Sequence, residues 1–324
     1  MKAKIAVLMG GRSLEREVSL ASGQRVAAAL EAAGYRVLPL DVTADLVGTL
    51  RSERPDAAYI ALHGKYGEDG TIQELLEFLG VPYTGPGVVA SALAWDKSVA
   101  KHLFAQKGIP TPSWITLTAD AFKEMGAATA LDLIPDAVGG FPVAVKPARQ
   151  GSALGLQRVD SAEGLADALL TALSYDTSAV VERWIEGTEL AVSVLGGIDA
   201  DGTDTVTVLP PVEIVPAAGL YDFSARVNAG DVDFFAPARI TPEAANAAMA
   251  VAREVHIALG CRDVSRVDLV LDEEGRPFVL ECNTSPGMTE TSLLPMAAEA
   301  ADMTFQDVVS RLVDAALTRA DSGT

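Results

Sequence analysis

The chain has 324 residues and is 49% hydrophobic, which is enough for two or three domains with cores of their own. Its formal net charge of -19 argues against a nucleic-acid-binding protein, because phosphate groups repel an acidic surface. The apolar run at residues 4–9 is too short for a signal peptide, and no run reaches the roughly 18 apolar residues of a membrane span. We therefore expect a cytoplasmic protein that contacts neither nucleic acid nor membrane.

Strands alternate with helices in the first part of the chain. The helix expected at residues 14–33 has a good N-cap in Ser13 and a good stop in Gly34. Such alternation indicates βαβ units and a mostly parallel sheet, so we predict an open α/β domain over residues 1–95. The dinucleotide fingerprint G-x-G-x-x-G is absent. The other elements expected here are strands at residues 4–9, 35–40 and 57–62 and a helix at residues 71–79.

A smaller, strand-rich stretch follows. The helix expected at residues 96–106 is broken by the Gly- and Pro-containing segment 108–112. Strands at residues 142–147 and 156–159 enclose a Gly-rich segment at residues 150–155. We predict a central domain over residues 96–180, whose remaining elements are a strand at 113–117 and a helix at 161–173.

The last part of the chain, residues 181–324, is predicted to form a C-terminal domain. A loop is expected at residues 216–235, and a hairpin falls between the two expected helices. The strands are expected at residues 179–185, 189–195 and 205–215, and the helices at residues 242–259 and 304–316.

The hairpin carries the most informative side chains of the sequence. Side chains alternate between the faces of a strand, so Arg266 and Asp268 share one face. The expected pairing places Asp268 opposite Glu281 and Arg266 opposite Asn283. Two carboxylates and a carboxamide at one place suit Mg²⁺, which completes its shell with water and substrate phosphates. The alternative is an ion pair between Asp268 and a basic residue such as Arg266.

That pairing assumes that Leu271 faces Phe278 across the turn. It also places Leu280 and Cys282 together on the apolar face, so that Cys282 is a small buried residue. Cys261 and Cys282 lack metal-ligand spacing, and nothing in the sequence demands a disulfide between them.

Two glycine-containing loops follow strands of the first domain. Ligands bind at the carboxyl ends of strands in open α/β sheets, so His63, in the loop 63–70, is a candidate ligand contact. The alternative is an ordinary turn in which Asp69 caps the next helix. Glu15 opens the first helix, where the macrodipole alone favours a carboxylate, although it could also hold a substrate ammonium.

Two lysines lie where a phosphate could bind. Lys146 ends an apolar strand before the Gly-rich segment 150–155, although the Walker A spacing is missing, and Lys97 follows the first domain. The alternative for both is a solvated lysine. The segment 180–189 could pair with an adenine edge or form a plain domain junction, and the Gly287 N–H could face a developing oxyanion.

Four segments, in order along nearly the whole chain, resemble the D-alanine–D-alanine ligases of the ATP-grasp superfamily. They are GGRSLEREVSL at residues 10–20, HGKYGEDG at 63–70, VKPARQGSALG at 145–155, and RVDLVL with FVLECNTSPGMT between 266 and 289. The resemblance implies the three-domain ATP-grasp fold, with an N-terminal open parallel-sheet domain and ATP between the other two domains. It implies the synthesis of D-alanyl-D-alanine for peptidoglycan.

The resemblance also implies a role for each candidate residue. ATP would be bound by Lys97, Lys146, Glu182, Trp184, Ile185, Glu189 and Arg226. Two Mg²⁺ ions, for which Mn²⁺ could substitute, would be held by Asp268, Glu281 and Asn283. Glu15 and His63 would contact the first D-alanine, and Ser292 and Leu293 would contact the second. Arg266 and the Gly287 N–H would stabilise the acyl oxygen. Ser152 would link Glu15 to a mobile loop, and the expected assembly is a homodimer.

The implied reaction has two steps. The carboxylate of the first D-alanine attacks the γ-phosphate of ATP and gives an acyl phosphate and ADP, and the second amine then displaces phosphate. Mg²⁺ and the lysines would neutralise phosphoryl charge. Because an acyl phosphate hydrolyses in water, a closing lid is needed, and residues 221–227 resemble its start.

The sequence departs from the family pattern at two places. Arg226-Val227 stands where the family usually has Lys-Tyr, and Ala153 stands where a second Ser is common. Arg226 keeps a cation for the γ-phosphate, but Val227 lacks the phenol that bonds Ser152. The alternative is therefore a ligase with a changed second substrate, such as D-serine, D-lactate or another amino acid, in specialised metabolism or antibiotic resistance. Arg266 argues against a third hypothesis, a non-catalytic nucleotide-binding protein, which needs no cation at an acyl oxygen.

Restoring the tyrosine tests the first departure. In Val227→Tyr we expect changed kinetics and a changed acceptor profile, because the phenol would again bond Ser152 and hold the lid. Steady-state rates with D-alanine, D-serine and D-lactate as second substrate measure both. Kinetics and acceptor profile identical to those of the unaltered chain would refute the link.

Overall fold

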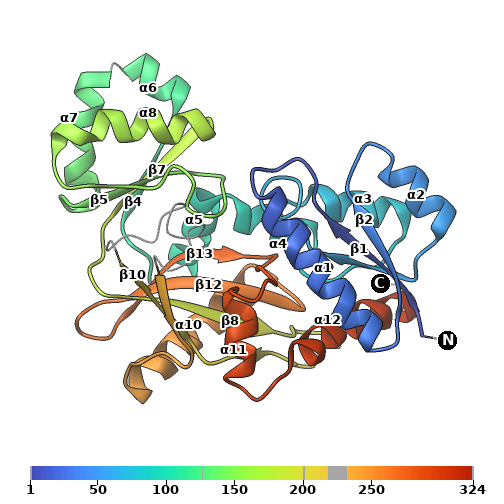
Figure 1. The fold of residues 1–324 in the computed structure, drawn as a ribbon. Coiled ribbons are helices and arrows are strands. Elements are labelled where there is room, and N and C mark those ends of the chain that lie inside the picture. The colour runs from blue at the N-terminus through green and yellow to red at the C-terminus, as the bar shows by residue number, and fades with distance from the viewer. Residues whose placement is uncertain (1, 126, 200, 218–231, 323–324) are drawn as a thin grey trace.

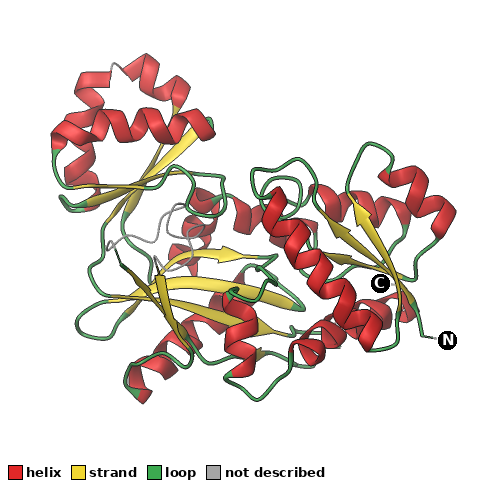
Figure 2. Ribbon diagram, in the orientation of Figure 1, coloured by secondary structure: helices red, strands yellow, loops and turns green. Residues whose placement is uncertain are grey.

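The computed structural model describes residues 2–125, 127–199, 201–217 and 232–322, which fold around three β-sheets (Figure 1). Helices and strands are mixed along the whole chain, as predicted for an α/β fold (Figure 2). Within the described ranges, none of the helices combines the length and the apolar character that crossing a membrane requires.

The N-terminal sheet is parallel, as the alternation of strands and helices predicts, with the strand order β2-β1-β3. Both faces of β1 are covered, because Ile5 and Val7 belong to one apolar core and Ala6 and Leu8 to another. The elements are β1 (Lys4–Met9), α1 (Arg16–Ala32), β2 (Arg36–Asp41), α2 (Leu46–Glu53), β3 (Ala57–Ile60), α3 (Thr71–Leu79) and α4 (Val88–Trp95).

Helix α1 begins two residues later than predicted, and Ser13 is not its N-cap. The Ser13 hydroxyl donates to the His63 carbonyl at 2.7 Å and accepts the Glu15 N–H at 3.2 Å. Ser13 therefore joins the loop after β1 to the loop after β3. Glu15 takes the N-cap position of α1 without a side-chain cap bond.

The central sheet is antiparallel, with the strand order β4-β7-β5-β6, and α7 and α8 lie on the same side of it (Figure 1). Val143 and Val145 face the helices, whereas Ala144 and Lys146 face the opposite way, into a cavity. The elements are β4 (Trp114–Thr118), α6 (Ala119–Met125), α7 (Ala127–Val138), β5 (Val143–Pro147), β6 (Gln157–Val159), a 3-10 turn (Ala162–Gly164), α8 (Leu165–Tyr175) and β7 (Ser178–Arg183).

The C-terminal sheet is antiparallel and has helices on both faces, with the order β11-β10-β8-β12-β13 and β9 paired to β8. In β8, Leu190 and Val192 pack in the core that contains α10, and Ala191 and Leu195 in the core that contains α11. The elements are β8 (Thr188–Leu195), β9 (Thr207–Val208), β10 (Val212–Pro216), β11 (Val232–Phe235), α10 (Pro242–Ala258), β12 (Val264–Leu271), β13 (Pro277–Asn283), α11 (Leu293–Glu299) and α12 (Phe305–Ser322).

Two predictions for the C-terminal strands were wrong. The strand expected at residues 205–215 is split into β9 and β10, because Pro210 and Pro211 have no N–H to donate to a sheet. The loop expected at residues 216–235 ends in a strand, β11, which pairs with β10.

Two helices connect the sheets. Helix α5 (Lys97–Lys107) buries Ala100 and Phe104 in the core beneath the C-terminal sheet, next to α10. Helix α12, at the other end of the chain, packs against α1 and β3 of the N-terminal sheet. The domain boundaries expected after residues 95 and 180 stay predictions.

A buried carboxylate fastens α12 to the loop after α3. Arg319 donates to both oxygens of Asp263 at 2.7 Å and to the Tyr83 carbonyl at 2.7 Å. Asp263 also accepts the Gly85 N–H at 2.9 Å and is only 6% exposed. One side chain thus joins the C-terminal helix, the start of β12 and the N-terminal domain.

Neutralising this carboxylate should loosen the junction. We expect Asp263→Asn to lower the free energy of unfolding by about 2 kcal/mol, because charge-assisted bonds to Arg319 are lost while the side-chain shape is kept. Asp302→Asn is the matched control, since Asp302 is exposed and both residues have a left-handed φ, 62° and 58°. Urea unfolding measures both variants, and equal losses would contradict the role of Asp263.

Candidate active site

The hairpin of β12 and β13 has the predicted register at its charged end. Arg266 lies opposite Asn283 and Asp268 opposite Glu281. Near the turn the pairing predicted between Leu271 and Phe278 was wrong, since Leu271 faces Pro277 instead. The register shifts by one residue between Asp268 and Leu269, so a β-bulge separates the two halves.

The bulge moves one side chain to the other face. Leu280, predicted on the apolar face, lines the same cavity as Asp268, Val270 and Glu281. Cys282 lies beyond the bulge and stays in the core as predicted, 5% exposed, and both cysteines are free thiols. The extra residue in β13 therefore adds an apolar group to a cavity wall that otherwise carries carboxylates.

Asp268 is held by its neighbours on the same face. Arg266 binds both Asp268 oxygens at 2.7 Å, and the Asn283 amide donates to one of them at 3.0 Å. The ion pair weighed as the alternative for Asp268 is therefore present. Among the described side chains, no group of three or more His, Cys, Asp or Glu is placed to hold a metal ion.

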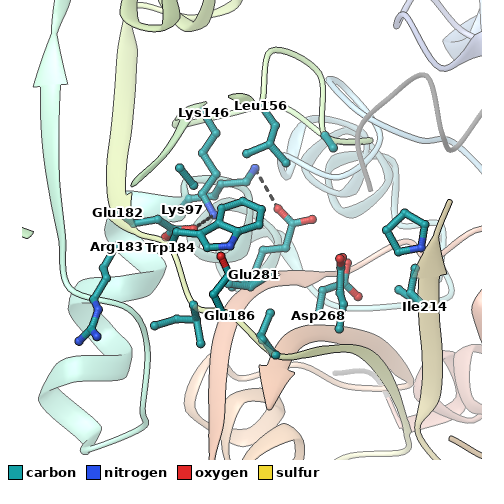
Figure 3. A pocket seen from close by; sticks show the side chains of 18 of the residues that line it. Lys97, Lys146, Leu156, Glu182, Arg183, Trp184, Glu186, Ile214, Asp268 and Glu281 are labelled. Atoms are coloured by element: carbon teal, nitrogen blue, oxygen red, sulfur yellow. Dashed lines mark hydrogen bonds and ion pairs between the residues drawn. The ribbon is translucent and has the colours of Figure 1, made fainter. Parts of the chain in front are cut away.

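A cavity of about 410 Å³ lies between the central and C-terminal sheets (Figure 3). Leu154, Leu156, Ile214 and Val270 give it apolar walls, and charged groups occupy one part of it, a combination typical of small-molecule sites. The predicted residues that line it are Lys97, Lys146, Glu182, Trp184, Ile185, Glu189, Asp268 and Glu281.

Lysines and carboxylates pair along this cavity, as the dashed lines in Figure 3 show. Lys97 Nζ lies 3.2 Å from Glu281 Oε2 and donates to the Gln150 carbonyl at 2.5 Å. Lys146 Nζ lies 2.5 Å from Glu182 Oε1. All three charged residues Lys97, Lys146 and Glu182 are less than 9% exposed, so the alternative of solvated lysines is wrong.

Lys101 belongs to the same network and was missed in the sequence. Its Nζ lies 2.7 Å from the second oxygen of Glu182. Burial lowers the pKa of Lys101 to about 8, and Glu182 opposes this fall. Burial alone would raise the pKa of Glu182, but Lys101 and Lys146 hold it below its ordinary value. The spacing of four residues from Lys97 was the available signal, because it places both lysines on one helix face.

Glu15 lies where the two glycine-containing loops meet. The Ser152 hydroxyl donates to its carboxylate in a short hydrogen bond. A side chain at Gly64 would approach Glu15 Oε2 to 2.2 Å, and Gly64 has a left-handed φ of 69°. Only glycine fits there, so the 63–70 loop closes directly over the Glu15 carboxylate.

His63 is buried next to this carboxylate. Its Nδ1 donates to the Ser285 carbonyl at 3.0 Å, and its Nε2 lies 3.1 Å from the Ser22 hydroxyl, which accepts the Met288 N–H. In the neutral ring, which burial favours, Nε2 accepts from the Ser22 hydroxyl. Burial lowers the pKa of His63, which the Glu15 charge opposes.

Glu68, which was not singled out in the sequence, is buried in the same region. Burial and then the Glu15 charge raise the pKa of Glu68 well above its ordinary value, while Arg266 opposes the shift. Glu68 lines a small hollow with Lys97, Gln150 and Glu281, which also line the large cavity. The Glu15 region is therefore adjacent to the charged part of that cavity.

The remaining predicted residues lie around the start of α11, before α3 or outside the described ranges. A side chain at Gly287 would approach Ser292 Oγ to 2.6 Å, so these residues are brought together. Leu293 is 5% exposed in the core, which leaves only its backbone for a ligand. Asp69 accepts the Thr71 N–H at the start of α3, although the N-cap of that helix is Gly70. Arg226 and Val227 lie outside the described residues.

Comparisons of the sequence agree along the chain. Residues 4–54 and 46–86 match the family model of the D-ala D-ala ligase N-terminus, and residues 103–314 that of the D-ala D-ala ligase C-terminus. A D-alanine–D-alanine ligase of Pelotomaculum thermopropionicum is 45% identical, with 98% of each chain covered. One from an Anaeromyxobacter species is 44% identical at the same coverage.

Solved structures agree as well. A D-alanine–D-alanine ligase of Bacillus anthracis complexed with ATP aligns with a TM-score of 0.82 and 30% identity, covering 99% of this chain and all of the other. The VanG D-Ala:D-Ser ligase of Enterococcus faecalis aligns with a TM-score of 0.82 and 29% identity, covering 98% of this chain and all of the other. The three sheets, the cavity between two of them and these similarities have one explanation. The chain belongs to the D-alanine–D-alanine ligase family.

Proposed function

We propose that this chain is an ATP-dependent ligase that joins two D-alanines to D-alanyl-D-alanine, with release of ADP and phosphate, for peptidoglycan synthesis. The observation that supports this most is the adjacency of two sites. The large cavity shares Lys97, Gln150 and Glu281 with the small hollow that Glu68 lines, and Gly151 of that hollow lies next to the Glu15 carboxylate. A nucleotide phosphate and an amino acid carboxylate could therefore meet at their junction.

ATP would occupy the large cavity. Its apolar part, near Leu156, Trp184 and Ile185, suits a purine, and Glu189 on β8 would accept from the ribose hydroxyls. Lys97 and Lys146 would face the phosphates, where an ammonium neutralises charge that moves during transfer. Arg226 would add a cation at the γ-phosphate.

Asp268, Glu281 and Asn283 would hold Mg²⁺, or Mn²⁺ in its place, together with the phosphates. The donor set fits, because one or two carboxylates with substrate phosphates is the usual arrangement for Mg²⁺. The metal would supply charge neutralisation at the phosphoryl group. Arg266 pairs with Asp268 and Lys97 with Glu281, so cations already accompany both carboxylates.

The first D-alanine would bind beside Glu15, whose carboxylate would hold its ammonium, with His63 next to it. The carboxylate oxygen of this D-alanine attacks the γ-phosphorus of ATP, the bond between the γ-phosphorus and the β-phosphate oxygen breaks, and ADP leaves. The amine of the second D-alanine, placed by Ser292 and the Leu293 backbone, attacks the acyl carbon and loses a proton as phosphate leaves. Arg266 and the Gly287 N–H would stabilise the charge on the acyl oxygen.

A ligase with a different second substrate is the second candidate. It is supported by Val227 and Ala153, which stand where the family pattern has Tyr and commonly Ser, and by the similarity to a D-Ala:D-Ser ligase structure. We also propose three domains at residues 1–95, 96–180 and 181–324, a homodimer, and a cytoplasmic location with small-molecule partners.

The products identify the function. With ATP, Mg²⁺ and a panel of D-amino and D-hydroxy acids, we expect mass spectrometry to detect D-alanyl-D-alanine with one phosphate released per product. A mixed product in the presence of D-alanine as well as D-serine or D-lactate would favour the second candidate. No phosphate release with any D-amino acid would overturn both.

A change at Glu281 tests the metal role. In Glu281→Gln we expect activity to fall by about 10- to 100-fold and half-maximal activity to need more Mg²⁺, because an anionic oxygen ligand is lost. Glu274→Gln, in the exposed turn of the same hairpin, is the matched control. An unchanged Mg²⁺ dependence in Glu281→Gln would count against the assignment.

A further inference from the structure

Lys101 is a fully buried charge for which the reaction above has no use. It is 0% exposed and lies on α5, one turn after Lys97. A charge taken out of water destabilises a protein unless other groups compensate for it. The compensating groups are Glu182 at 2.7 Å, the Thr111 hydroxyl at 2.6 Å and the face of Trp114, whose ring centre is 5.6 Å away.

Through Glu182, Lys101 is connected to the large cavity. Glu182 lies on β7 opposite Trp114 on β4, and its two oxygens bind different lysines. Lys101 holds the oxygen that faces α5, and Lys146 holds the other. Because the carboxylate is shared, Lys101 reduces the negative charge that acts on Lys146 and fixes the direction in which Glu182 points.

The other side reaches the strand that carries Glu281. The Thr111 hydroxyl accepts from Lys101 and donates to the Val279 carbonyl at 2.7 Å, while the Val279 N–H donates to the Pro110 carbonyl at 2.9 Å. Val279 directly precedes the β-bulge of β13. Lys101 therefore connects the wall with Glu182 to the wall with Glu281, and Lys97 on the same helix face binds Glu281 itself.

We propose that Lys101 is a positioning residue of the nucleotide site, which holds β7 and β13 at a fixed separation and keeps Lys146 available for a phosphate. This inference rests on the proposed binding of ATP in the large cavity. Lys101 lines neither the large cavity nor the small hollow that Glu68 lines. Its loss should weaken nucleotide binding and leave the chemical steps largely unchanged.

Two substitutions test the positioning role of Lys101, one at Lys101 itself and one at Thr111, which links it to β13. In Lys101→Met we expect the KM for ATP to rise about tenfold with kcat changed less than about threefold, the pattern of lost uniform binding. Thr111→Val, which keeps the charge of Lys101 but removes the link to β13, should raise the KM in the same direction. The double variant should be no worse than Lys101→Met, because both changes break one connection.

The controls separate positioning from folding. Lys107→Met makes the same substitution at an exposed position of the same helix and should keep the KM of the unaltered chain. Lys101→Arg keeps the charge and should recover part of the affinity for ATP. If Lys101→Met does not fold, the KM for ATP of Thr111→Val and of Lys101→Arg tests the positioning role instead.

Binding of ADP with Mg²⁺, followed by calorimetry, gives a readout that does not depend on the ligase reaction. We expect weaker ADP binding in Lys101→Met and Thr111→Val but not in Lys107→Met. If Lys101→Met and Thr111→Val keep the ADP affinity and the KM for ATP of the unaltered chain, and that chain is an active ligase, the positioning role is overturned and the proposed function stays intact. An unaltered chain that binds ADP but forms no dipeptide would overturn the function instead.

Discussion

The site depends on the pairing of buried lysines with buried carboxylates. Lys97 with Glu281, and Lys101 and Lys146 with Glu182, place several charges in a region from which water is largely excluded. Removing one partner would leave an uncompensated charge, and this penalty restricts how the surrounding strands can pack. The central and C-terminal sheets therefore meet around a cavity with charged walls instead of a continuous apolar core.

Helix α5 is the element through which this constraint acts. Its apolar face packs beneath the C-terminal sheet through Ala100 and Phe104, while Lys97 and Lys101 project toward the two walls of the cavity. The helix is thus anchored by hydrophobic burial on one side and by ion pairs on the other. The β-bulge in β13 adds a local adjustment, because it turns Leu280 toward the large cavity without displacing Asp268 from Glu281.

The N-terminal domain completes the site by a different means. The Glu15 carboxylate is enclosed by the Gly64 backbone and the Ser152 hydroxyl, and His63 is locked by Ser22 and Ser285. Apart from the close approach of the Gly64 backbone, these contacts are hydrogen bonds made by side chains, and the Asp263 and Arg319 pair adds a second attachment of this part of the chain. Periodicity could not predict them, because each partner comes from a remote part of the chain, and only the family resemblance indicated the link between Ser152 and Glu15.

The sequence by itself determined the α/β class, the parallel N-terminal sheet and the pairing of Asp268 with Glu281, because strand periodicity and alternation are local properties. Motif order was enough to indicate the ligase family. The tertiary structure decided the β-bulge that moves Leu280, the burial of Lys101 and Glu68, and the pairing of Lys101 and Lys146 with Glu182. These features depend on contacts between residues distant in sequence, and periodicity carries no information about which distant charges will meet.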